Sequence, residues 1–351
     1  MSRNAVIEDD LQTILSDQNI DWKALEGSTI LISGANGFLP AYIVETLMFA
    51  NETVFKNKTK IIGIVRSNNK AHARFPYFKN RNDIEFIEQD IAAPLQVSGD
   101  IDYIIHAASH ASPRYFFSDP VGTIAANAMG TDNLLKIAKD KKSKSFLFFS
   151  SGEACGNIFD TKDVVTENDY GVLDPLAVRS CYGESKRMGE SLCACYFHQY
   201  GVPAKVVRPA HTYGPGFSFD DGRAFASFVG SVIHNQNIVL KSDGKACRSF
   251  IYLADATRGY FTVLLKGQNG QAYNVGNEYE ISMLELANTV IQASGNTKLK
   301  VEFDIPKSGN VSSSNMHGLL SIDKIKSLGW NPITREPEGF KRTIDYYRSI
   351  P

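Results

Sequence analysis

The sequence has few features that would cross-link, anchor or strongly charge the protein. Its 351 residues include only five cysteines, without a Cys-x-x-Cys pair, so no disulfide framework or metal motif is indicated. A formal charge of −1 gives no argument for nucleic acid or an anionic membrane as a partner. The most apolar early run, residues 38–50, is too short to span a bilayer, and residues 1–10 lack a signal pattern. We therefore expect a cytoplasmic protein with reduced thiols, no metal, and neither nucleic acid nor membrane as partner.

Short apolar runs alternate with segments of helical spacing. Six runs rich in β-branched or aromatic residues predict strands, and three longer segments predict helices between them. The predicted strands cover residues 29–33, 60–65, 84–88, 103–106, 145–150 and 204–208. The predicted helices cover residues 40–51, 123–139 and 182–200. This alternation predicts an α/β protein with a doubly wound parallel sheet (Rossmann fold) that binds its ligand at the carboxyl ends of the strands.

The regular alternation of strands and helices ends near residue 208. Turns and loops with separate helices and short strands follow, which suggests a division into domains. A helix over residues 223–235, a strand over 238–241 and a helix over 283–293 are predicted in the second half. Residues 248–264 are expected to return to the first domain. The expected parts are an N-terminal extension (1–28), a dinucleotide-binding Rossmann domain (29–208) and a smaller α/β substrate-binding C-terminal domain (209–351).

A glycine-rich turn joins the first predicted strand to the first predicted helix, and it runs from Ser33 to Pro40. Glycine here lets the backbone approach a pyrophosphate, and the helix N-terminus supplies N–H groups with a partial positive charge. Pro40 stands where a third glycine is common, and a first helical turn tolerates proline because its missing N–H would be unpaired. The predicted cofactor contacts in this turn are Gly34, Asn36, Gly37, Phe38 and Leu39.

The residue after the second predicted strand distinguishes NAD from NADP. An acidic residue there binds the ribose 2′-hydroxyl, whereas an arginine accommodates a 2′-phosphate. Because the sequence has Arg66 and no acid nearby, NADP is favoured over NAD. The alternative is an Arg66 that is solvated or stacks on adenine. Residues after the third and fourth strands complete the predicted cofactor site: Asp90, Ile91, Ala107, Ala108 and Ser109.

Tyr182 and Lys186 form the candidate proton-transfer pair, with Ser151 about thirty residues earlier. Positions i and i+4 of a helix face the same way, so Lys186 lies beside the tyrosine ring. A cation about 4 Å away, at an effective dielectric near 20, lowers the pKa of a tyrosine from ~10 by up to roughly three units. Tyr182 could then exchange a proton with an alcohol held by Ser151 while hydride moves to or from a nicotinamide. The alternative is that the pair lies on an ordinary half-buried helix with no catalytic role. That alternative does not explain why the glycine turn and Ser150-Ser151 precede the pair in the same chain.

Further motifs extend this pattern along the chain from about residue 29. They are Ala111-Ser112-Pro113, Asp119-Pro120-Val121, Asn127 to Leu135, Glu167 to Gly171, Arg179 to Arg187, Asp221-Gly222-Arg223 and Met283 to Ala287. With these motifs the chain resembles the extended short-chain dehydrogenase/reductases, in the NAD-dependent epimerase/dehydratase family of nucleotide-sugar enzymes. Within that family it is most similar to the UDP-glucuronate decarboxylases (UDP-xylose synthases).

The resemblance implies that Tyr182 takes the proton of a sugar 4-hydroxyl as hydride moves to the cofactor. The 4-keto group then acidifies the neighbouring carbon, so that decarboxylation, dehydration or epimerisation follows before the hydride returns. Glu153 occupies the position of a carboxylate that decarboxylating and dehydrating members carry; a surface glutamate is the alternative. A UDP- or dTDP-linked sugar as substrate and a homodimer formed by residues 123–139 and 182–200 are also implied.

The resemblance also implies further binding residues. Besides Tyr182 and Lys186, the residues added for the cofactor are Asn127, Ser150 and Arg208. The residues implied for the substrate are Ser112, Pro113, Arg114, His211, Arg223 and Arg248.

Three departures from the family pattern leave other functions open. Arg66 replaces the acidic residue that the decarboxylases use for NAD, His211 replaces an asparagine that contacts the diphosphate, and Gly318 replaces a substrate-binding arginine. The loss of a guanidinium removes a bidentate anion contact. An NADPH-dependent 4-ketoreductase of a 4-keto-6-deoxy nucleotide sugar is therefore the main alternative. A catalytically silent nucleotide-binding subunit is a third.

Overall fold

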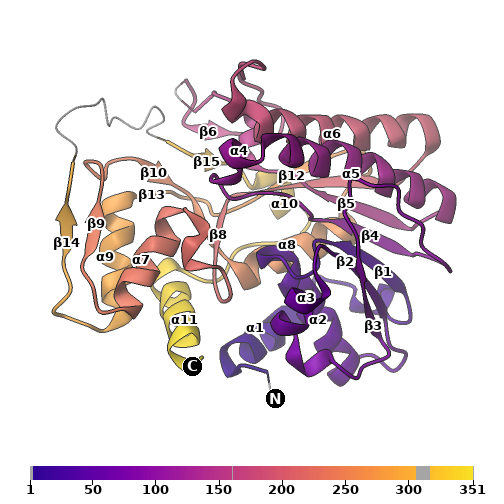
Figure 1. Ribbon diagram of the computed structural model, residues 1–351, viewed down its shortest axis with the longest axis horizontal. Coiled ribbons are helices and arrows are strands. Elements are labelled where there is room, and N and C mark those ends of the chain that lie inside the picture. The colour runs from indigo at the N-terminus through magenta and orange to yellow at the C-terminus, as the bar shows by residue number, and fades with distance from the viewer. Residues whose placement is uncertain (1–2, 160, 306–316, 351) are drawn as a thin grey trace.

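A seven-stranded parallel sheet forms the centre of the molecule, as the alternating pattern predicts (Figure 1). The computed structural model describes residues 3–159, 161–305 and 317–350. The strand order is β12-β7-β5-β4-β1-β2-β3, so the direction of winding reverses between β1 and β4. The strands are β1 (Thr29–Ser33), β2 (Lys60–Val65), β3 (Ile84–Glu88), β4 (Tyr103–His106), β5 (Ser145–Phe149), β7 (Ala204–Pro209) and β12 (Ala272–Val275).

Helices cover both faces of the sheet (Figure 1). One face packs against α5 and α6, which lie side by side, and the other against α1, α2 and α8. Because both faces are buried, the strands read as almost continuous apolar runs. Within the described ranges, no helix is long and apolar enough to cross a membrane. The bounds are α1 (Ala5–Leu15), α2 (Phe38–Thr53), α5 (Pro120–Lys141), α6 (Cys181–Tyr200) and α8 (Leu253–Lys266).

The elements of the first half lie close to their predicted bounds, and the helices are longer than predicted for local reasons. Helix α2 begins two residues before Pro40 because Gly37, in extended conformation, is its N-cap. Helix α5 begins at Pro120, where the Asp119 carboxylate accepts the N–H of Gly122 at 3.1 Å. A capping side chain satisfies one of the unpaired N–H groups of a first turn, which moves the helix start toward it.

Two segments from beyond residue 208 belong to the central layers. Helix α8 packs on the sheet next to α1 and α2, and β12 adds a strand by pairing with β7, with Ala272 opposite Val206. The sequence predicts the return of residues 248–264 but not this strand, whose four residues give too short a signal. The sheet is therefore built from both halves of the chain.

The first helix is joined to the last one, α11 (Glu336–Ser349). The Asp10 carboxylate of α1, only 2% exposed, accepts hydrogen bonds from Tyr42 at 2.8 Å, from Tyr252 at 2.7 Å and from the Arg342 guanidinium of α11 at 2.6 Å. A buried carboxylate is tolerated when donors of this kind surround it. Helix α1 is consequently a buried part of the fold and not a solvated extension.

A smaller α/β lobe lies beside the sheet and contains α7, α9 and α11 (Figure 1, left). In this lobe, β9 pairs with β14 in parallel and β10 with β13 antiparallel. Helix α9 starts with a capping box between Ser282 and Glu285. The remaining bounds are α3 (Asn68–Arg74), α4 (Tyr115–Ser118), β6 (Val164–Val165), β8 (His211–Tyr213), α7 (Ala224–Ile233), β9 (Ile238–Leu240), β10 (Cys247–Arg248), β11 (Phe250–Tyr252), β13 (Ile281–Ser282), α9 (Met283–Ser294), β14 (Val301–Phe303), β15 (Leu319–Leu320) and α10 (Asp323–Lys326).

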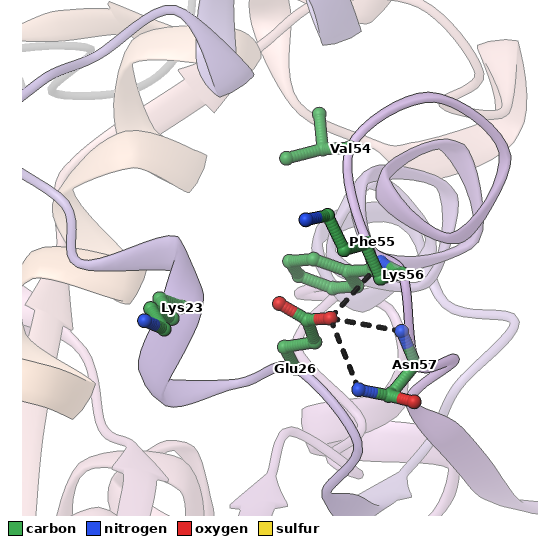
Figure 2. Close-up of a pocket in the computed structure, with 6 residues that line it drawn as sticks. All are labelled: Lys23, Glu26, Val54, Phe55, Lys56 and Asn57. Atoms are coloured by element: carbon green, nitrogen blue, oxygen red, sulfur yellow. Dashed lines mark hydrogen bonds between the residues drawn. The ribbon is translucent and has the colours of Figure 1, made fainter.

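One surface hollow, of about 600 Å³, lies at the amino ends of β1 and β2 (Figure 2). There the Glu26 carboxylate accepts the backbone N–H groups of Lys56 and Asn57 at 3.0 and 2.8 Å. These bonds fix the loop after α2 to the segment before β1. Doubly wound sheets bind ligands at the carboxyl ends of their strands, so we assign this hollow a structural role.

Candidate active site

The glycine turn brings the ends of β1 and β4 into contact. Gly34 has φ +67°, and a Cβ atom at this position would lie 2.8 Å from the Cα of Ala108. The Ser33 hydroxyl accepts the N–H groups of Ala107 and Ala108 at 3.2 and 3.1 Å. Positive φ and close backbone approach both require glycine. The turn thus has the shape of a pyrophosphate cradle, with the N-terminus of α2 beside it.

Gly34→Ala is expected to weaken dinucleotide binding at least tenfold and to lower the midpoint of thermal unfolding. The new Cβ meets backbone atoms that cannot move aside, in addition to the strain of positive φ. Gly99→Ala is the matched control, because Gly99 has φ +77° but no atom within 4 Å of its Cβ position. Isothermal titration with NAD⁺ and thermal unfolding measure both effects. Equal losses in the two variants would mean that the contact with Ala108 is unimportant.

Buried polar atoms without partners lie around this turn. In the described part of the chain, the Ser109 hydroxyl and the Asn127 side-chain oxygen are buried and make no hydrogen bond. The Asn127 amide donates to the Ser185 hydroxyl at 3.0 Å, which orients the side chain. Unpaired buried polar groups are costly, and a polar ligand would satisfy these two. Together with the glycine cradle they fit a dinucleotide.

The other predicted adenine and ribose contacts lie at the ends of β2 and β3. Asp90 is exposed, and its carboxylate accepts the N–H of Ala92 at 2.9 Å. Ile91 is buried against Gly130 of α5. Arg66 is exposed and hydrogen-bonded to the ring of His110. These residues lie along the same edge of the sheet as the glycine turn, although Arg66 already has a partner.

Tyr182 and Lys186 lie on α6, where both are almost fully buried, at 6% and 2% exposed. The Lys186 ammonium group is 5.6 Å from the centroid of the Tyr182 ring and donates to the carbonyl of Phe149 at 2.6 Å. Burial lowers the pKa of Lys186 to about 7. The structure therefore brings the pair together with the end of β5, which is where Ser151 begins a short turn.

The expected lowering of the Tyr182 pKa is absent in the protein without ligands. Burial, and then the charge of Glu153, raise the pKa of Tyr182 to about 12, although a hydrogen bond with Ser151 opposes this. The Lys186 ammonium group lies 5.6 Å from the centre of the ring, and the charges that act most on the Tyr182 pKa are those of Glu153, Arg223 and Arg179. Spacing along a helix predicts that two side chains are neighbours, but it does not predict where their polar ends point.

Glu153 follows Ser151 in this turn and forms an ion pair that the sequence does not reveal. Its carboxylate accepts two hydrogen bonds from Arg179, at 2.8 and 3.1 Å. Arg179 also lies over the ring of Phe116, which stacks on Tyr182. The only sequence signal is that Arg179 precedes Tyr182 in a shared motif. Arg179 is thus a functional candidate that the sequence prediction missed, whereas Phe116, which the sequence leaves open as a pocket or core residue, is buried against Tyr182.

A cavity of about 690 Å³ is lined by the catalytic candidates Ser151, Glu153 and Tyr182, though not by Lys186, and by most of the predicted substrate residues. His211 lines it next to Phe250 with an exposed side chain, and the protein around the ring, followed by the charges of Arg223 and Arg248, lowers the pKa of that ring. Ser112 and Arg114 instead hold the loop before α7, by donating to the carbonyls of Asp221 and Asp220. The predicted site residues that line the cavity are Leu39, Pro113, Ser150, Ser151, Glu153, Tyr182, His211, Arg223 and Arg248.

Arg248 takes up the space that a side chain at position 318 would need. A Cβ atom on Gly318 would lie 2.9 Å from the Cδ of Arg248. Next to it, His317 forms an ion pair with Glu280, which raises the pKa of His317, and the Gly318 N–H donates to Glu280 at 2.9 Å. In place of the arginine that the resemblance implies at 318, the aliphatic part of the Arg248 side chain lies beside the Gly318 backbone.

Arg208 does not line the cavity, because it pairs with Glu190 of α6. The same glutamate orients Ser150. The Arg208 side chain is fully buried, and its guanidinium donates to both carboxylate oxygens of Glu190, at 2.8 and 2.6 Å. Glu190 also accepts a hydrogen bond from Ser150. A buried arginine with all these contacts holds β7, α6 and the end of β5 together. Direct cofactor binding by Arg208, as predicted, is not supported by this arrangement.

Comparison with known proteins identifies the family. A family model described as the NAD dependent epimerase/dehydratase family matches residues 30–276. The chain belongs to the NAD-dependent epimerase/dehydratase family. The matched residues include the glycine turn, Ser151, Tyr182 and Lys186. As its motifs predict, this member of the epimerase/dehydratase family is an enzyme of the nicotinamide-dependent, sugar-nucleotide-modifying type.

Relatives of known function are similar to this chain over about nine tenths of its length. UDP-glucuronic acid decarboxylase 6 of Arabidopsis thaliana is 32% identical over 327 residues, 91% of this chain and 88% of the relative. Among solved structures, UDP-glucose 4-epimerase of Thermotoga maritima with UDP-glucose has a TM-score of 0.76 at 23% identity, covering 91% of this chain and 98% of its own. UDP-glucuronic acid 4-epimerase of Bacillus cereus, with UDP-glucuronic acid and NAD, has a TM-score of 0.74 at 23% identity, covering 91% and 99%. The predicted fold is thereby confirmed.

Proposed function

We propose that this enzyme binds a nucleoside diphosphate sugar, oxidises it at C4 with its nicotinamide cofactor and then decarboxylates it, as a UDP-glucuronate decarboxylase does. The observation that carries the proposal is the shared cavity, which is lined by the proton-transfer group Tyr182 and by the cations Arg223 and Arg248. Arginine binds phosphate oxygens with geometric specificity. A substrate with a reactive sugar at one end and a diphosphate at the other fits this distribution.

In the proposed reaction, Tyr182 takes the proton of the 4-hydroxyl while Ser151 hydrogen-bonds the same oxygen. When bound, the oxidised nicotinamide would accept the hydride from C4 and, after carbon dioxide has left, return it to the 4-keto carbon. Lys186 and Asn127 are suited to orient its ribose. Oxidation at C4 makes a 6-carboxylate a β-keto acid, so that its C–C bond breaks with release of carbon dioxide and formation of an enol. Glu153 lies beside Tyr182 and is the candidate for moving the proton that C5 regains.

NADP is the preferred cofactor in this proposal, because Arg66 follows β2 where an acidic residue would select NAD. The structural relative from Bacillus cereus, which is a different protein, holds NAD. The alternative reaction, NADPH-dependent reduction of a 4-keto-6-deoxy nucleotide sugar, is favoured by Gly318. With glycine there, the cavity lacks the arginine that the resemblance implies for a substrate anion, and a 4-keto-6-deoxy sugar has no carboxylate that would need it.

A homodimer through α5 and α6 is part of the proposal. Apolar side chains on the outer surfaces of these helices support it, because large exposed apolar residues gather at interaction surfaces. The exposed residues concerned are Val121, Ile124, Met129 and Met188. Residues 209–351 are proposed to supply most of the substrate-binding part, with α8 and β12 completing the Rossmann domain.

Mass spectrometry of purified enzyme incubated with UDP-glucuronate and either NAD⁺ or NADP⁺ tests the proposal. We expect a product lighter by one carbon dioxide, formed faster with NADP⁺. Unchanged substrate with both cofactors would contradict decarboxylation. A product of unchanged mass but altered chromatographic mobility would indicate epimerisation instead. Incubation of a 4-keto-6-deoxy nucleotide sugar with NADPH is the parallel test of the reductase, in which oxidation of NADPH would favour the alternative.

A further inference from the structure

The Arg179–Glu153 pair stands at the wall of the active-site cavity. Both side chains line the cavity, and they are 47% and 42% exposed. The two nitrogens Nη1 and Nη2 of Arg179 each donate to a different oxygen of Glu153, at 2.8 and 3.1 Å. This bidentate geometry is the strongest form of such a pair. Exposure reduces its contribution to stability, so its position suggests a role in the reaction instead.

A stack of three groups connects the same arginine to the catalytic tyrosine. The Arg179 guanidinium carbon lies 4.6 Å from the centroid of the Phe116 ring. The same ring stacks on Tyr182, with centroids 4.6 Å apart and planes inclined by 20°. Phe116 is fully buried, and Cys181 donates to its carbonyl at 3.6 Å. The tyrosine ring is therefore held between α6 and a phenylalanine that Arg179 covers.

We propose that Arg179 is a positioning residue of the reaction: it neutralises the Glu153 carboxylate beside Tyr182 and, through Phe116, keeps the tyrosine ring in place. The proposal rests on the proposed function, because it concerns the same proton-transfer step. It adds a role for a residue to which that function gives none. It also explains why a carboxylate can stand next to a tyrosine that has to lose a proton.

Charged groups on several elements act on the pKa of Tyr182, and Arg179 is one of them. Glu153, in the turn after β5, raises the pKa of Tyr182, whereas Arg223, before α7, and Arg179, before α6, lower it. Ser151 hydrogen-bonds the hydroxyl, and Lys186 and Cys181 are the remaining titratable neighbours on α6. If Arg179 lost its charge, the Glu153 carboxylate would act on Tyr182 without compensation. The tyrosine would then ionise at higher pH.

The test uses Arg179→Gln, Arg179→Lys and the double variant Glu153→Gln/Arg179→Gln. Each is mixed with UDP-glucuronate and oxidised cofactor, and the rate at which reduced cofactor forms is measured as a function of pH. We expect Arg179→Gln to lower the rate at neutral pH about tenfold and to move the ascending limb of the profile about one pH unit upward. The double variant returns the limb close to its original position, because both charges are gone. Arg179→Lys keeps that position but loses rate.

Matched controls separate this role from a loss of stability. Arg81→Gln removes another bidentate pair, in which Arg81 donates to Asp83 at 2.8 and 2.5 Å far from the cavity, and it should leave the profile unchanged. Profiles of Arg179→Gln and wild type that superimpose would overturn the proposal. So would a double variant shifted as far as the single one, since the shift would then not come from the Glu153 charge.

A second measurement keeps the proposal testable if UDP-glucuronate is not a substrate. Tyrosinate absorbance is titrated in the enzyme–cofactor complex, as the difference between each protein and its counterpart with Tyr182→Phe. Ionisation of Tyr182 at higher pH in Arg179→Gln than in wild type supports the role of Arg179 even when no product forms. Equal titrations refute it. Failure of the proposed function alone would appear as inactive wild-type enzyme with the expected titration shift.

Discussion

Tyr182→Phe is expected to slow hydride transfer by between about 10² and 10⁴, the usual contribution of a positioned acid or base. Phenylalanine keeps the ring that stacks on Phe116, so the fold and the cavity should persist while the proton acceptor is lost. Formation of reduced cofactor on mixing with substrate measures the hydride step. A rate within threefold of wild type would show that another group takes the proton.

The pH dependence of the wild-type reaction supplies a second check on Tyr182. The base must be ionised, and the pKa of Tyr182 is about 12 in the free protein because burial and Glu153 raise it. The rate should therefore rise with pH through the neutral range. The positive charge of an oxidised nicotinamide ring nearby favours the tyrosinate, so the rising limb of the pH profile should end below pH 12 in the complex.

The control for the substitution itself is that cofactor affinity and thermal unfolding of Tyr182→Phe should match those of wild type.

Glu190→Ala is expected to have the largest effect on stability, with a loss of about 3–5 kcal/mol. It leaves the Arg208 guanidinium, which is 0% exposed, without its charged partner, and an uncompensated buried charge costs this much. The midpoint of thermal unfolding should fall by about 4–7 °C for a chain of this size. Ser150 would lose its acceptor at the same time, so activity should fall even in the folded fraction.

Two further variants test this explanation. Glu184→Ala, on the same helix, removes a half-exposed carboxylate 3.9 Å from Arg187 and should cost at most about 1 kcal/mol. Glu190→Leu/Arg208→Met replaces the buried pair by apolar groups and should recover most of the stability lost in Glu190→Ala. If the double variant were as unstable as Glu190→Ala, packing rather than charge would account for the loss.

Local sequence patterns were sufficient to predict the central strands, the glycine turn and the helix that contains Tyr182 and Lys186. Short apolar runs identify the strands, and the glycine turn from Ser33 to Pro40 identifies the cradle because Gly34 needs positive φ. The spacing of Tyr182 and Lys186 places them on one side of α6. Each of these features depends on residues close together in the sequence, where periodicity and backbone conformation determine the result.

Features that depend on long-range contacts could not be predicted in this way. Arg179 finds Glu153 across 26 positions, and no local pattern marks the pair. The raised pKa of Tyr182 comes mainly from burial, which depends on the whole fold. Arg208 looks like a ligand-binding arginine at a strand end, but its partner Glu190 lies on a different element. Charge alone does not reveal whether such a side chain meets a ligand or another residue.

The hydrogen bonds between α1 and α11 also bear on how the chain folds during synthesis. Asp10 receives the Arg342 guanidinium from a position 332 residues later. While the ribosome is still making the second half, this carboxylate lacks that donor. The edge of β7 that pairs with β12 in the finished sheet is unpaired at the same stage. The nascent first half therefore has an unfinished core and an unpaired strand edge, which are features that chaperones recognise. We expect the native fold to form only after residue 342 has been translated and has left the ribosome.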